Sequence, residues 1–153
     1  MNKLSTRINN LSESATLAMS RLSRELKQQG KDVISLSLGE PDFNTPDFIK
    51  NSAVQAINDN FSHYTPVPGI LELRKSICKK FYRDNNLEFN ENQIVVSTGA
   101  KQSIANVCLS LLDKGDEVIL LAPYWVSYFE IVKLCGAKPI IVESKIEENF
   151  KWN

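Results

Sequence analysis

The chain has few of the side chains that metal sites and hydrolytic triads need. It contains one histidine, His63, and three widely spaced cysteines, Cys78, Cys108 and Cys135, with no C-x-x-C pair. A histidine-based metal site or a Ser-His-Asp triad therefore has little to draw on. The odd cysteine count favours buried thiols of a reducing compartment over a disulfide framework.

The chain also lacks an excess of charge and any long apolar run. Eighteen basic residues offset eighteen acidic ones, and both kinds are scattered, which argues against a nucleic-acid or anionic-membrane surface. The first residues have no apolar segment of signal-peptide length. No run of apolar residues is as long as a membrane span, which needs about 20 residues. We therefore expect a cytoplasmic protein.

What is present is the composition of a globular domain, with 42% hydrophobic and 24% charged residues. The pattern of the first half predicts a helix that is capped by Ser12 or Ser14 and ends at Gly30. A half-buried strand is then expected over residues 32–38, where serines alternate with apolar residues. Two proline-containing loops, 39–48 and 61–70, alternate with two further helices. Thr45 is expected to cap the first of these, with Pro46 at its first position and an end near Asn58, and the second runs from about Gly69 through 86.

The second half alternates apolar runs with helical patterns. Residues 93–143 predict the order strand, helix, strand, helix, strand, with strands near 94–98, 117–122 and 137–143. Nearly continuous apolar strands separated by helices indicate an α/β fold with a mainly parallel sheet covered on both faces. Three strands with their helices make a poor core, so we expect the chain to be the N-terminal part of a longer protein.

The segment VVSTGAKQS raises a specific question, because a lysine lies in the first turn of a predicted helix, where anions are favoured. The N–H groups of Gly99, Ala100 and Lys101 would form an anion site that fits a phosphate. The pattern is neither a P-loop nor a G-x-G-x-x-G turn, so ATP and NAD are not indicated. An ordinary strand-to-helix turn with a solvated lysine remains the alternative.

Three other places carry residues that could contact a ligand. Trp125 and Tyr128 follow the next strand and could form a stacking wall for a planar ligand, although packing into the core is the alternative. Gly39 would let the backbone approach a ligand closely, and the phenol of Tyr64 could donate to a phosphate. Two neighbouring strand ends with such residues favour one site that holds an aromatic phosphate.

Several segments, in this order, resemble one known family: LSLGEPDFNTP, HYTPVPGILELRKSI, VVSTGAKQSI and GDEVILLAPYWVSY. They are similar to the fold-type I, class-I aminotransferases that depend on pyridoxal 5′-phosphate, and most similar to the bacterial aspartate aminotransferases. The resemblance implies the PLP-transferase-like fold. It also implies an N-terminal arm with part of the small domain over residues 1–45, and the first part of the large cofactor-binding domain over 46–153.

The resemblance also implies roles for most of the residues picked out above. Gly99 would turn the chain so that the N–H groups of Ala100 and Lys101 hold the cofactor phosphate, and Trp125 would stack on the pyridine ring. Tyr64 would reach the cofactor phosphate of a neighbouring subunit, which implies a homodimer with a shared active site. The substrate's α-carboxylate would contact the backbone at Gly39, and Trp125 would also contact the substrate. The side-chain carboxylate of an acidic substrate would contact Lys101 and Thr16.

The implied reaction moves an amino group between L-aspartate and 2-oxoglutarate. The family's Schiff-base lysine, ring-nitrogen carboxylate and substrate arginine would lie beyond Asn153, so no catalytic residue is expected here and the 153-residue chain alone is expected to be inactive. Two alternatives remain open: an aminotransferase for aromatic or other amino acids or for prephenate, and a truncated non-catalytic protein. Some prephenate-accepting relatives carry KPSAT where this chain has SESAT, so Ser12 replaces their lysine.

Overall fold

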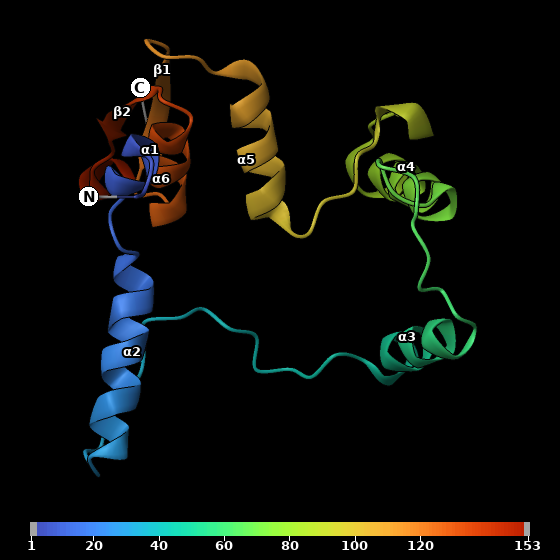
Figure 1. The fold of residues 1–153 in the computed structure, drawn as a ribbon, viewed down its shortest axis with the longest axis horizontal. Helices are drawn as coiled ribbons and strands as arrows, with labels where there is room; N and C mark the ends of the chain where they lie inside the picture. The colour runs from blue at the N-terminus through green and yellow to red at the C-terminus, as the bar shows by residue number, and fades with distance from the viewer. Residues whose placement is uncertain (1–2, 152–153) are drawn as a thin grey trace. The chain divides into compact units, whose positions relative to one another are not determined.

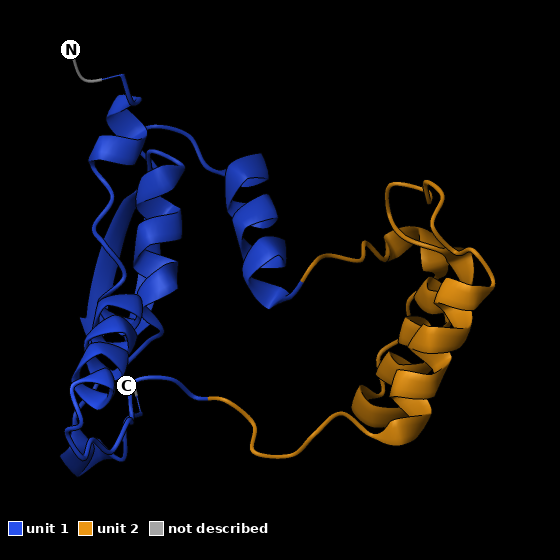
Figure 2. Cartoon of the chain, turned by 60° about the horizontal axis from the view of Figure 1, so that its bottom comes forward, with its two compact units in different colours: residues 1–39, 99–153 blue, residues 40–98 orange. Residues whose placement is uncertain are grey.

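The structure is a computed structural model that describes residues 3–151. The chain divides into two compact units, which are described separately below (Figures 1 and 2). The first unit combines residues 1–39 with 99–153, and the second comprises residues 40–98. The first unit therefore joins the N-terminal helices to the segment that carries the lysine and the aromatic pair.

The first unit begins with two helices, α1 (Thr6–Asn9) and α2 (Ala15–Gln28). The side chain of Ser14 accepts a hydrogen bond from the N–H of Leu17 and caps α2, so Ser14 rather than Ser12 is the cap. Gly30, with φ +80°, lies just beyond the end of α2, as expected. The sequence pattern thus placed this helix and its end correctly.

The same unit continues with α5 (Ala100–Leu111), β1 (Glu117–Ala122), α6 (Val126–Leu134), β2 (Lys138–Glu143) and the 3₁₀ turn η2 (Ile146–Glu148). The strands β1 and β2 pair in parallel, with Glu117 opposite Lys138 and Ala122 opposite Glu143. A parallel pair needs a crossover, and α6 supplies it. Leu120, Ile131, Val132 and Ala137 are buried between these elements, with Val132 only 2% exposed.

Two predicted strands are wrong. Within residues 3–151, the sheet contains β1 and β2 alone, and segments 32–38 and 94–98 pair with neither. A strand is defined by a partner, and an alternating pattern can only show that a segment suits one. Ile119 of β1 is also 65% exposed, so the described residues do not supply the expected cover on both faces.

The second unit contains α3 (Asp47–Asn58), α4 (Leu71–Asn85) and the 3₁₀ turn η1 (Glu91–Gln93). The helix α3 ends at Asn58, as predicted. Its N-cap position is occupied by Pro46, which has no side-chain donor or acceptor, so Thr45 is not the cap and Pro46 lies one residue earlier than expected. Proline suits this end of a helix because its missing N–H would have no partner there.

The proline-containing loop before α4 is held within the second unit. The Arg74 side chain donates to the carbonyl oxygens of Gly69 (3.1 Å) and Glu91 (2.7 Å). The N–H of Val96 donates to the carbonyl of Pro68 at 3.0 Å. These bonds fix the end of the loop that carries Tyr64 against residues 91–96.

Over residues 3–151, no helix is long and apolar enough to cross a membrane. The division at residue 45 into an arm and a cofactor-binding domain stays a prediction.

Candidate functional site

A hollow of about 490 Å³ in the first unit brings four of the predicted site residues together. The start of α2 contributes Thr16, the following irregular segment contributes Gly39, the first turn of α5 contributes Lys101, and Trp125 precedes α6. The rest of its lining comprises Ser14, Leu17, Ser37, Leu38 and Ser127. Residues from four separate segments thus meet at one place.

The start of α5 has the geometry of an open helix end. Gly99 occupies its N-cap position with φ +83° and ψ 161°, a conformation that a side chain would strain, and within the described chain no side chain caps this end. The N–H groups of Gln102 (3.1 Å) and Ser103 (3.4 Å) donate to the Gly99 carbonyl oxygen. The N–H groups of Ala100 and Lys101 lie in the first turn, where a helix supplies no acceptor of its own. This arrangement suits an anion.

The lysine and the indole are in direct contact. The Nζ atom of Lys101 lies 4.4 Å from the ring centroid of Trp125, within the range of a cation–π interaction. The ring of Tyr128 meets Trp125 edge-on, with centroids 5.7 Å apart and an interplanar angle of 90°. Among the described residues that line the hollow, Lys101 is the one charged side chain, so the hollow is positive and partly aromatic.

Hydroxyl groups form another part of the hollow's lining. Ser14, Thr16, Ser37 and Ser127 all contribute to it, and each hydroxyl can donate a hydrogen bond to a carboxylate. Sequence reasoning named only Thr16 of these for substrate binding. The signal for Ser37 was weak, because its place in an alternating segment indicated a strand face and not a site.

The remaining predicted residue, Tyr64, lies in the second unit and is fully exposed, at 108% of its reference area. It does not belong to the lining of the hollow. Its role at a neighbouring subunit's cofactor stays a prediction.

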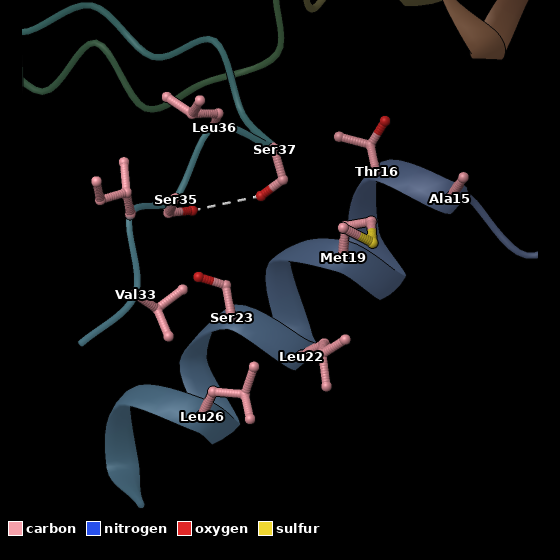
Figure 3. A pocket seen from close by; sticks show the side chains of 11 residues that line it. Ala15, Thr16, Met19, Leu22, Ser23, Leu26, Val33, Ser35, Leu36 and Ser37 are labelled. Carbon is pink, nitrogen blue, oxygen red and sulfur yellow. Dashed lines mark hydrogen bonds between the residues drawn. The ribbon is translucent and has the colours of Figure 1, made fainter. Parts of the chain in front are cut away.

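A second hollow, of about 480 Å³, lies between α2 and residues 33–37 (Figure 3). Figure 3 shows Met19, Leu22 and Leu26 of α2 and Val33 of the facing segment around it, while the hydroxyls of Ser35 and Ser37 lie 3.4 Å apart. Its lining within the described residues has no charged side chain, so it suits packing better than it suits an anion.

The resolved pKa shifts lie away from the lysine-containing hollow. The pKa of Asp84 is lowered to about 2, chiefly by its hydrogen bond from Arg83, and the pKa of the Cys135 thiol is raised by burial first and by Cys108 second. Asp84 lies at the surface, so its ion pair adds little to stability. Across residues 3–151, no group of three or more histidine, cysteine or acidic residues could hold a metal ion.

Comparison with known proteins identifies the family to which the chain belongs. The family described as "Aminotransferase class I and II" matches residues 31–153, so the chain belongs to that family. The resemblance seen in the motifs and the predicted fold class are therefore confirmed.

Several individual relatives are named for aspartate. The chain is 49% identical to a "Probable aspartate/prephenate aminotransferase" of Rickettsia felis over 151 residues, which is 99% of this chain. It is also 49% identical to the "Aspartate aminotransferase" of Bacillus subtilis over 149 residues, which is 97% of this chain. It superposes along its whole length on the aspartate aminotransferase from Thermus thermophilus with maleate, with a TM-score of 0.95 and 41% identity. The chain spans only 37%, 38% and 40% of the lengths of these three proteins.

Proposed function

We propose that the complete protein containing this chain is a pyridoxal-phosphate-dependent aminotransferase that moves an amino group between L-aspartate and 2-oxoglutarate. The observation that carries the proposal is the hollow that joins Lys101, Thr16, Gly39 and Trp125. One ammonium group beside several hydroxyls suits a dicarboxylate, which brings a second negative charge to the site. The names of the Rickettsia and Bacillus relatives support the same substrate.

The residues present fit the cofactor that this family uses. The uncapped first turn of α5, with Gly99 in a left-handed conformation, suits a phosphate at the N–H groups of Ala100 and Lys101. The indole of Trp125 offers a flat surface next to that turn, as its contact with Lys101 shows. When bound, pyridoxal phosphate supplies the electron sink that makes the substrate's α-proton acidic.

The chain's own residues then bind and orient the substrate. Lys101 and Thr16 hold the side-chain carboxylate, and the backbone at Gly39 contacts the α-carboxylate. The indole of Trp125 fixes the plane in which the reaction takes place and keeps water from one side of it. The groups that transfer protons belong to the part of the protein beyond Asn153.

The protein works as a cytoplasmic homodimer in this proposal. Tyr64 donates its hydroxyl hydrogen to the cofactor phosphate of the neighbouring subunit, so that each active site draws on two chains. Residues 1–45 form the N-terminal arm and part of the small domain, and residues 46–153 begin the large domain. The full exposure of Tyr64 in a single chain is compatible with a contact to a second one.

Prephenate is the second candidate substrate, because the Rickettsia relative is named for both aspartate and prephenate. Ser12 replaces the lysine of some prephenate-accepting relatives, and in this structure it offers its backbone N–H to Glu130. We therefore rank prephenate below aspartate.

The test is to express the complete reading frame, load it with pyridoxal phosphate, and measure oxaloacetate formed from aspartate and 2-oxoglutarate. We expect turnover with aspartate and weaker turnover with prephenate as the amino acceptor. A folded, cofactor-loaded protein that forms no oxaloacetate would refute the aspartate assignment. A complete reading frame that ends at Asn153 and binds no cofactor would favour the non-catalytic alternative.

A further inference from the structure

A long-range hydrogen bond joins the N-terminal segment to α6. The backbone N–H of Ser12 donates to Oε2 of Glu130 at 3.2 Å, across 118 residues of sequence. The short helix α1, which precedes Ser12, also contacts α6. The segment that leads into α2 is therefore attached to α6 by a charged acceptor as well as by packing.

The acceptor is itself held in place. Nζ of Lys133, one turn further along α6, lies 3.3 Å and 3.4 Å from the two carboxylate oxygens of Glu130. Both side chains are 26% exposed, and the Lys133 ammonium also lies 5.4 Å from the centroid of the Phe129 ring. A carboxylate that is oriented in this way and partly shielded from water makes a stronger bond to an N–H than a free one does.

Both ends of this link lead directly to the candidate site. Ser12 lies two residues before Ser14, the cap of α2, and four before Thr16, and both of these line the lysine-containing hollow. Glu130 lies in the same helix whose start carries Trp125 and Ser127, which line the hollow from the other side. The Glu130 bond therefore joins the segment just before α2 to the helix whose start lines the hollow.

We infer that Glu130 is a positioning residue for acidic substrates: its bond to the Ser12 N–H keeps Ser14 and Thr16 facing Lys101 across the hollow. This inference rests on the proposed function, because it assigns the hollow to the substrate's second carboxylate. Glu130 is not among the residues that line the hollow, so in this inference it acts without touching the substrate. It acts by setting the distance between hydroxyls on α2 and the ammonium on α5.

The test uses the complete protein loaded with cofactor and compares Glu130→Ala, Glu130→Gln and Lys133→Met. Glu130→Ala removes the acceptor, and we expect the KM for aspartate to rise about fivefold or more, as for the loss of a charged hydrogen bond. The kcat for aspartate and the KM for alanine, which lacks a second carboxylate, should change less than about twofold. Glu130→Gln keeps an acceptor oxygen and should restore most of the aspartate KM. Lys133→Met keeps the carboxylate but removes the ammonium that orients it, so it should raise the aspartate KM by less than Glu130→Ala does. Glu72→Ala, a glutamate change on α4 in the second unit, is the matched control.

A second measurement does not depend on activity. Hydrogen exchange in a peptide that covers residues 10–17 should speed up in Glu130→Ala, with Glu130→Gln and Glu72→Ala close to the parent. Unchanged exchange in Glu130→Ala, or an equal rise in KM for aspartate and alanine, overturns the inference. A parent protein that is inactive with aspartate but shows the exchange difference refutes the proposed function and leaves the link itself established.

Discussion

The two units of the chain differ in how far they complete the candidate site. The first unit, residues 1–39 with 99–153, assembles a hollow from its own residues, with the Lys101 ammonium already 4.4 Å from the centre of the Trp125 ring. The second unit, residues 40–98, carries Tyr64 fully exposed on a loop whose far end is pinned by Arg74 and Val96. The first unit thus gathers several predicted site residues in one hollow, whereas the second carries one predicted site residue on a loop that is hydrogen-bonded at its far end.

The largest expected effect tests the first unit's cation. Lys101→Ser should lower kcat/KM for aspartate by about 10- to 100-fold, the range for a lost hydrogen bond to a charged group. The loss for phenylalanine should be much smaller, because that substrate has no second carboxylate. The measurement is steady-state kinetics of the complete protein with both amino acids, and Lys114→Ser is the matched control in the turn after α5. Equal losses with the two substrates would favour an enzyme for aromatic or other amino acids.

The next effect tests the second unit's rigid loop. A Cβ at Gly69 would lie 2.8 Å from Cγ2 of Val96 at φ +100°, so Gly69→Ala should lower the free energy of unfolding by about 2 kcal/mol. Gly30 has a similar φ of +80° but open space around it, so Gly30→Ala should cost only about 1 kcal/mol. Urea unfolding of both variants gives the difference. If the two changes cost the same, the packing of the loop against Val96 contributes nothing.

The third effect concerns the indole in the first unit. Trp125→Ala should weaken cofactor binding about tenfold, because it removes an aromatic surface worth about 0.5–1.5 kcal/mol beyond its buried area. Trp125→Phe keeps a smaller aromatic face and should recover part of the loss. Cofactor titration followed by absorbance measures both. Unchanged affinity in Trp125→Ala would show that the indole does not stack on the cofactor and serves only its contacts within the protein, with Lys101 and Tyr128.

The smallest effect tests whether the second unit acts on another subunit. Tyr64→Phe removes one hydroxyl and should weaken cofactor binding about threefold to fivefold, the size of one net hydrogen bond.

Subunit mixing then sharpens this test. In a mixed dimer of Tyr64→Phe and Lys101→Ser chains, one site collects both changes and the other is intact, so about a quarter of the sites in an equal, re-equilibrated mixture carry neither change. At limiting cofactor, the aspartate activity of the mixture should therefore exceed the mean of its two components. A mixture no more active than the mean of its two components would place Tyr64 at its own subunit's site.

Local patterns predicted the helices and the parallel pair well. The crossover through α6 follows from two apolar runs that flank a helical segment, and β1 occupies the predicted residues 117–122. Segments 32–38 and 94–98 have equally strand-like sequences but do not pair within the described chain. Pairing depends on a partner strand, and that information is absent from a local pattern.

The site could also be predicted only in part, because local patterns identify single residues but not contacts between distant segments. Lys101 and Trp125 were identified because each follows an apolar run at the start of a helix, and the structure brings them into contact. Thr16 follows only from the family resemblance, and Gly39 follows from both its loop and the resemblance; both line the same hollow. The link from Glu130 to Ser12 had no sequence signal, because its two ends are 118 residues apart and a backbone N–H leaves no trace in side-chain patterns.

The most direct test of the account is a crystal structure of the complete protein with pyridoxal phosphate and maleate. We expect the phosphate at the N–H groups of Ala100 and Lys101, the ring against the indole of Trp125, and one maleate carboxylate within hydrogen-bonding distance of Nζ of Lys101. A cofactor bound elsewhere, with the hollow filled by protein side chains, would contradict the central claim that this hollow is the substrate site.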